Sequence, residues 1–145
     1  MPKRSAHTSW TGGLQDGSGQ VTLTSSGAGS YEVSFPKRAA DDASGTTSPE
    51  ELIAAAHSAC YAMQLSALIA AGGGTPVGLD VDVTVTLSPD PAGGFRISSI
   101  EITVRGTVEG MDDAAFKKTA DDAKTQCPVS KALTGTTITL DAALL

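Results

Sequence analysis

The feature that most constrains this sequence is an uncharged stretch from Leu52 to Leu79, preceded by a complete set of helix-start signals. Ser48 is a residue type that caps helices, a proline follows in the first helical position, and Glu51 stands where a capping-box acid is expected. Three consecutive glycines at 72–74 favour a helix end after about Ala71. The sequence therefore predicts one long, apolar helix in the middle of the chain.

The apolar residues of this helix cover most of its circumference, so we expect it at the centre of the fold, wrapped by sheet or by another subunit. Its first twenty positions would also be long enough to cross a bilayer. They are, however, rich in alanine rather than leucine, and they include His57, Ser58 and Gln64. Hydropathy criteria therefore favour a helix buried inside a soluble protein, and we expect no membrane association.

Segments with strand character flank the helix on both sides and are separated by turns rich in glycine and proline. After the helix we expect a long antiparallel hairpin, a helix capped by Asp112, a short helix starting at Pro128 and a last strand. This order predicts an α+β fold, with an antiparallel sheet wrapped around a long buried central helix, in a single domain over residues 1–145. The expected strands are His7–Thr11, Gln20–Ser25, Ser30–Phe35, Val77–Ser88, Phe95–Val108 and Thr136–Leu140, with a surface loop at 36–47.

The charge balance restricts the partners that the protein can have. The formal net charge is -6 and only ten Lys and Arg are present, whereas a protein that binds a phosphate backbone needs a basic face. No apolar run follows the basic N-terminus, so we expect no secretory signal and a cytoplasmic location. The sequence contains neither a cluster of metal ligands nor a phosphate-binding loop, so we expect no cofactor.

Two cysteines are present, and in a reducing compartment they are either inert core residues or a reactive pair. Cys60 lies in the middle of the long helix, roughly 16 Å from its N-terminus, where the helix dipole no longer acts. A reactive thiolate at Cys60 would therefore need a separate cation, and the loop at 36–47 offers Lys37 and Arg38. Without such a cation, Cys60 is interpreted as a small core residue.

Cys127 precedes Pro128 and so occupies the N-cap position of the short helix, where free backbone N–H groups favour a thiolate. Local electrostatics make Cys127 the more acidic thiol, and the spacing does not decide which cysteine attacks a substrate. His57 lies one turn before Cys60, and a Cys–His pair would suggest acyl transfer. No orienting partner for His57 is evident, so a structural histidine is the favoured interpretation.

Two segments, taken together, are similar to a known family. Ser48-Pro49-Glu50-Glu51-Leu52-Ile53-Ala54-Ala55-Ala56-His57-Ser58-Ala59-Cys60-Tyr61 is followed much later by Cys127-Pro128-Val129-Ser130. This combination resembles the osmotically inducible protein C (OsmC) and organic hydroperoxide resistance (Ohr) family, and the match spans essentially the whole chain. The residues Ala-Ala-His before the first cysteine and the spacing of Phe35-Pro36-Lys37-Arg38 resemble the OsmC-like branch.

The resemblance implies a peroxidase that reduces organic hydroperoxides, and more weakly hydrogen peroxide, to alcohols at a dimer interface. It assigns peroxide attack and a sulfenic acid to Cys60, resolution through a Cys60–Cys127 disulfide to Cys127, and activation to Arg38 with Glu50 as its partner. The resemblance further suggests that a dithiol of the lipoyl type then reduces the disulfide. Apolar walls that include Leu52 and Met63 are expected to favour an organic substrate.

Geometry adds one condition, because Glu50 and Cys60 are about 15 Å apart along a straight helix. One Arg38 side chain would struggle to reach both, so the helix begins later, or it bends, or Glu50 comes from a partner subunit. We therefore expect an intertwined homodimer with two sites across its interface. Two other functions remain open: a dimer that binds hydrophobic ligands with incidental cysteines, and a Cys–His acyl hydrolase that needs His57 but not Cys127.

Overall fold

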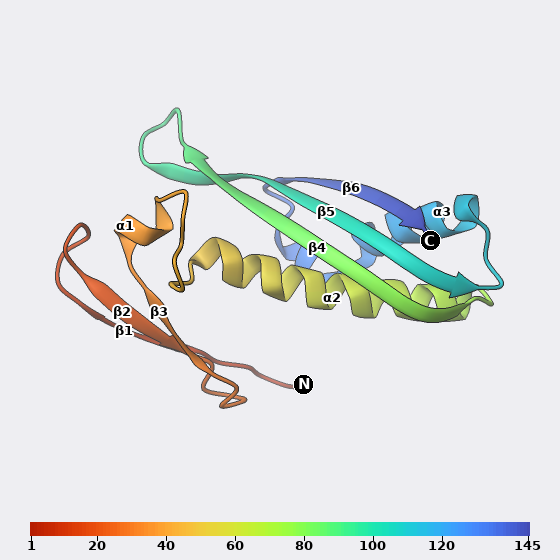
Figure 1. Ribbon diagram of the computed structural model, residues 1–145, viewed down its shortest axis with the longest axis horizontal. Helices are drawn as coiled ribbons and strands as arrows, with labels where there is room; N and C mark the ends of the chain where they lie inside the picture. The colour runs from red at the N-terminus through yellow and green to blue at the C-terminus, as the bar shows by residue number, and fades with distance from the viewer. The chain divides into compact units, whose positions relative to one another are not determined.

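The structure is a computed structural model that describes all residues from 1 to 145. The chain forms two compact units, Met1–Leu52 and Ile53–Leu145, which are described in turn. This division does not test whether the chain behaves as one domain over residues 1–145, which therefore stays a prediction. The mixed α+β class and the long central helix are confirmed (Figure 1).

The first unit consists of a small antiparallel sheet and a short helix. Its strands are adjacent in the order β1 (His7–Thr11), β2 (Ser18–Thr22) and β3 (Ser30–Val33). The helical turn α1 (Phe35–Arg38) follows, so the start of the expected surface loop is helical, because the Ser34 side chain accepts a hydrogen bond from the Lys37 amide. Nearly all side chains of the sheet are exposed, so this unit has almost no core of its own.

The long helix α2 (Pro49–Ala71) has the predicted ends. The Ser48 hydroxyl accepts the Glu51 amide at 3.1 Å, which satisfies one free donor of the first turn. The Glu51 carboxylate accepts a hydrogen bond from the Thr47 hydroxyl rather than from the Ser48 amide. Only one of the two hydrogen bonds of a capping box is therefore formed, the one from the Glu51 amide to Ser48. The helix therefore begins where the sequence indicates, and Glu50 lies in its first turn.

Burial of α2 differs from the expectation of a helix covered on all sides. Its buried side chains recur every fourth residue, and the opposite face is exposed, with Met63 73% accessible. By length and composition alone α2 could cross a membrane, but core helices of soluble proteins pass the same test. Three of the buried residues join the hydrophobic core of the second unit and the fourth is a buried histidine. The buried stripe is His57, Tyr61, Leu65 and Ile69.

The second sheet consists of β4 (Thr75–Pro89), β5 (Phe95–Glu109) and β6 (Thr137–Leu144). Strands β4 and β5 form the expected antiparallel hairpin. Strand β6 pairs in parallel with β5, so the prediction of a purely antiparallel sheet is wrong for this strand. The physical reason is the helical crossover between β5 and β6, which is the connection that parallel neighbours require.

That crossover is formed by α3 (Asp113–Gln126) and α4 (Pro128–Ala132), and the side chain of Asp112 caps α3 as predicted. Helix α3 places Phe116 in the core, close against β5. A Cβ atom at Gly106 of β5 would lie only 2.6 Å from the Phe116 ring, so glycine permits this close approach. Burying the phenyl ring contributes about 2–3 kcal/mol to folding. Helices α2, α3 and the second sheet thus share one core.

Candidate active site

The two cysteines, far apart in the sequence, meet in the second unit. Cys60 comes from the middle of α2 and Cys127 from the junction of α3 and α4. Both thiols are free, and their sulfur atoms are 3.2 Å apart, within hydrogen-bond distance of each other. A disulfide has an S–S length of about 2.05 Å, so only a small movement would join the two sulfurs.

The surroundings give the two thiols opposite acidities. Burial raises the pKa of Cys60, the neighbouring Cys127 sulfur raises it further, and the Val129 amide only partly opposes this. Burial also acts to raise the pKa of Cys127, but the amide of Ser130, the hydrogen bond with Cys60 and the Ser130 hydroxyl outweigh it, so this pKa is lowered. Cys127 is therefore the more acidic thiol of the second unit, although its sulfur forms no capping hydrogen bond with α4.

A buried polar pair joins α2 to α4 in the second unit. The Nε2 atom of His57 and the hydroxyl of Ser130 are 2.7 Å apart, His57 is fully buried, and its Nδ1 atom has no hydrogen-bond partner. Burial lowers the pKa of His57, so the ring is neutral near pH 7. No hydrogen bond joins His57 to Cys60, so the expected alternative of a Cys–His acyl hydrolase lacks its central pair.

The prediction of a structural histidine holds only for Nε2, since Nδ1 is left without a partner. Sequence reasoning did not assign a role to Ser130. The available signal was its position three residues after the N-cap cysteine, which places it in the first turn of α4.

A charged pair lies in the first unit. Arg38, at the end of α1, donates from Nη2 to Glu50 Oε1 at 2.7 Å and from Nε to both carboxylate oxygens at 3.1 and 3.2 Å. Burial acts to raise the pKa of Glu50, but the hydrogen bonds from Arg38 outweigh it and the pKa is lowered. Hydrogen bonding to Glu50 in turn raises the pKa of Arg38. The pair is therefore ionised, and the Nη1 atom of Arg38 takes part in none of these bonds.

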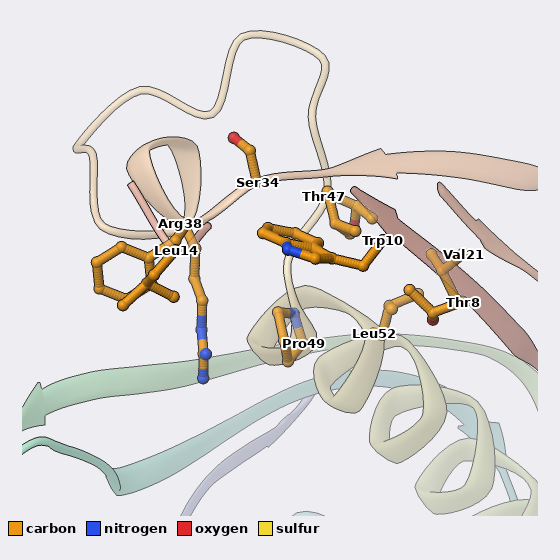
Figure 2. A pocket seen from close by; sticks show the side chains of 11 residues that line it. Thr8, Trp10, Leu14, Val21, Ser34, Arg38, Thr47, Pro49 and Leu52 are labelled. Atoms are coloured by element: carbon orange, nitrogen blue, oxygen red, sulfur yellow. The ribbon is translucent and has the colours of Figure 1, made fainter. Parts of the chain in front are cut away.

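A cavity of about 380 Å³ lies in the first unit beside Arg38. Figure 2 shows the indole ring of Trp10 and the side chains of Pro49 and Leu52 around this hollow. Leu52 thus lies in an apolar wall as expected, whereas Met63 does not line the cavity and is exposed on α2. The complete lining is Thr8, Trp10, Leu14, Val21, Val33, Ser34, Phe35, Arg38, Thr47, Pro49 and Leu52.

Comparison with known proteins identifies the family. The family model described as OsmC-like protein matches residues 41–141. The chain belongs to the OsmC-like family. It is 37% identical over 139 residues to peroxiredoxin OsmC of Escherichia coli K12, an alignment that covers 96% of this chain and 93% of that protein.

Two further OsmC/Ohr relatives agree with this assignment. Organic hydroperoxide resistance protein-like 2 of Staphylococcus epidermidis is 30% identical over 104 residues, covering 71% of each chain. The crystal structure of an organic hydroperoxide resistance protein from Elizabethkingia anophelis superposes with a TM-score of 0.77 at 25% identity, covering 100% of this chain and 98% of that one. The names of these relatives support a peroxidase-type oxidoreductase role for this OsmC-like chain.

Proposed function

We propose that this protein is a thiol peroxidase that reduces organic hydroperoxides to alcohols, with Cys60 and Cys127 as its redox pair. The observation that carries the proposal is the 3.2 Å separation of two free thiols that are 67 positions apart in the sequence. Two sulfurs at this distance can be joined by a disulfide and reopened without rearranging the fold.

The proposed reaction has three steps. The Cys60 thiolate attacks the hydroperoxide, the O–O bond breaks, and the alkoxide takes up a proton to leave as the alcohol while Cys60 becomes a sulfenic acid. The Cys127 thiolate then attacks the Cys60 sulfur, the S–O bond breaks, and hydroxide takes up a proton to leave as water. The two electrons that reduce the peroxide thus come from two sulfurs, and an external dithiol such as one of the lipoyl type restores both thiols by exchange.

Peroxide attack by Cys60 requires a cation, because burial and the neighbouring sulfur raise the pKa of this thiol. We assign this role to Arg38. Its Nε and Nη2 atoms donate to the Glu50 carboxylate, which holds the side chain in place. Its remaining Nη1 group would stabilise the thiolate and polarise the peroxide, in the way that preorganised donors stabilise developing charge.

We further propose that a second copy of the chain completes each site. Arg38 is bonded to the Glu50 of its own chain, and about 15 Å of helix separates Glu50 from Cys60. The guanidinium would therefore serve Cys60 of the partner in a symmetric dimer. The exposed apolar face of α2 supports this assembly, because its small side chains permit close packing of two helices. That face comprises Ala55, Ala56, Ala59, Met63, Ala67 and Ala70.

The cavity beside Arg38 supports a preference for organic hydroperoxides over hydrogen peroxide. Its lining is predominantly apolar, and its volume is in the range of small-ligand sites. An alkyl or aryl group bound there would gain from burial, whereas hydrogen peroxide has no such group. A cytoplasmic location, where thiols are kept reduced between turnovers, fits the two free cysteines.

Hydroperoxide consumption by three proteins tests the proposal. Without reductant, the wild type should consume about one equivalent of cumene hydroperoxide, Cys127→Ser should do the same but stop at the sulfenic acid, and Cys60→Ser should consume none. Cys60→Ser with wild-type consumption would overturn the proposal. Such a result, together with retained binding of a hydrophobic ligand, would favour a ligand-binding dimer with incidental cysteines.

A further inference from the structure

Two hydrogen bonds tie α2 to the helices on either side of Cys127. One joins Nε2 of His57 to the Ser130 hydroxyl of α4 at 2.7 Å. The other runs from the Tyr61 hydroxyl to the Ala120 carbonyl of α3 at 2.9 Å. All four bonded residues are buried, so water does not compete for either bond. These two hydrogen bonds are called the clamp below.

The clamp brackets both cysteines in the sequence. On α2, His57 and Tyr61 lie about one turn apart, and Cys60 lies between them. On the other side, Cys127 ends α3 and begins α4, so it lies between the two residues that the clamp holds on those helices. The two sulfurs, 3.2 Å apart, are therefore flanked by one hydrogen bond to α3 and one to α4.

Helix α4 depends on such a bond more than α3 does. Helix α3 has 14 residues and places Phe116, Ala120 and Ala123 in the core. Helix α4 has only five residues, which is too short for a helix to be stable by itself, and Ser130 is its one buried residue. The hydrogen bond between Ser130 and His57 is thus a buried polar anchor of α4 on α2.

We propose that His57 and Tyr61 are positioning residues, which hold Cys127 at bonding distance from Cys60 after peroxide attack and thereby set the rate of disulfide closure. The inference rests on the proposed peroxidase function and assigns residues to its second step. In that step the Cys127 thiolate attacks the sulfur of the Cys60 sulfenic acid, the S–S bond forms, the S–O bond breaks, and hydroxide takes up a proton to leave as water. Groups that are already held in place react faster, because orientation acts like a raised local concentration.

The consequence for the enzyme is a short lifetime of the sulfenic acid. The sulfenic acid at Cys60 has two competing fates, closure by Cys127 or attack on a second hydroperoxide. In the second case the sulfur gains an oxygen atom and becomes a sulfinic acid, the hydroperoxide leaves as an alcohol, and the enzyme is irreversibly inactivated. Closure within the clamp does not depend on peroxide concentration, so the clamp protects Cys60 when hydroperoxide is abundant.

Quenched-flow mass spectrometry after one equivalent of cumene hydroperoxide separates the two steps. Ser130→Ala and Tyr61→Phe each remove one bond of the clamp and keep most of the side-chain packing. Each should slow closure roughly five-fold, and the double variant roughly 25-fold, while consumption of the first equivalent of peroxide keeps its rate. Thr125→Ala is the matched control and should close at the wild-type rate, because its hydroxyl donates to the Asp121 carbonyl within α3.

The pH dependence of closure separates positioning from acidity. At about pH 10, above the ordinary pKa of a cysteine, Cys127 is ionised in every variant. A positioning defect persists there, so Ser130→Ala should still close slowly. Recovery of the wild-type rate at this pH would mean that Ser130 acts on the acidity of Cys127, which would overturn the inference.

Conservative variants should rescue closure. Ser130→Thr keeps the hydroxyl and should close close to the wild-type rate. The Nδ1 atom of His57 has no partner, so its proton is best placed on Nε2, because buried unpaired N–H groups are rare. His57→Gln can also donate an N–H to Ser130 and should close faster than His57→Leu, which cannot. Equal closing rates in these two variants would count against the clamp.

The redox equilibrium with dithiothreitol gives a second readout. A five-fold loss of local thiol concentration in Ser130→Ala should make the reduction potential of the disulfide about 20 mV less negative. If Ser130→Ala and Tyr61→Phe lower only the free energy of unfolding, with the closing rate and the potential unchanged, the inference is wrong and the peroxidase function stands. A wild-type protein that forms no disulfide would overturn both.

Discussion

The two units of this chain differ in what they contribute to a peroxidase. Met1–Leu52 contains the ion pair of Arg38 with Glu50 and a sheet with almost no core, in which Val21 is the one buried hydrophobic side chain. Ile53–Leu145 contains a well-packed core and both sulfurs, but no cation bonded to either sulfur. The packed core with its two sulfurs and the ion pair of Arg38 with Glu50 therefore lie in separate parts of the chain.

This separation explains why each unit is insufficient alone. In the second unit the more acidic thiol is Cys127, so peroxide attack by Cys60 requires an activating group from outside that unit. In the proposed mechanism, Cys60, the thiol with the raised pKa, receives this activation from the Arg38 guanidinium, which the first unit holds on Glu50.

Removing the cation should abolish most of the activity. We expect Arg38→Ala to lower kcat/KM for cumene hydroperoxide by about 100-fold or more, because it removes the donor that stabilises the Cys60 thiolate. Lys37→Ala, which removes a neighbouring exposed cation of α1, is the matched control and should retain activity. Equal losses in the two variants would show that general positive charge, rather than the Arg38 guanidinium, supports the reaction.

Combining two inactive chains should restore activity if the site is shared between copies. A heterodimer of Arg38→Ala and Cys60→Ser subunits, purified through two different tags, would contain one intact site and should have about half of the wild-type activity. Each homodimer should stay inactive. An inactive heterodimer would mean that Arg38 acts on Cys60 of its own chain. A protein that is monomeric and active in dilute solution would show that the reaction does not require a dimer.

Shortening the aromatic wall of the cavity should change substrate preference. We expect Trp10→Ala to lower kcat/KM for cumene hydroperoxide about ten-fold and to leave that for hydrogen peroxide nearly unchanged, since only the organic group uses the apolar surface. Tyr31→Ala is the control, because Tyr31 is a similarly exposed aromatic residue of the same sheet that does not line the cavity. An equal loss of kcat/KM for both substrates would mean that the organic group does not bind against Trp10.

The buried histidine should give the stability of the second unit a modest dependence on pH. The pKa of His57 in the folded state lies below its ordinary value of 6.5 because of burial, so the unfolded chain binds a proton more readily. The free energy of unfolding should therefore fall as the pH drops below 6.5. Urea unfolding at pH 7.5 and 5.5 should show a smaller decrease for His57→Gln than for the wild type, and His7→Gln, at an exposed site, should match the wild type.

Much of the fold could be predicted because its signals are local. Ser48 and the glycines at 72–74 mark the two ends of α2, and Asp112 caps α3, since caps depend on a few neighbouring residues. The parallel pairing of β6 could not be predicted, because it depends on which sheet edge the crossover meets. The contact between His57 and Ser130 likewise joins distant segments, and only packing reveals it.

The central claim is that organic hydroperoxide converts the two thiols into a single disulfide. The most direct measurement is peptide mapping by mass spectrometry after the reduced protein has reacted with one equivalent of cumene hydroperoxide. The account predicts one cross-linked species that joins the peptides of Cys60 and Cys127 within one chain, with the peroxide consumed. Two free thiols with unconsumed peroxide would contradict it.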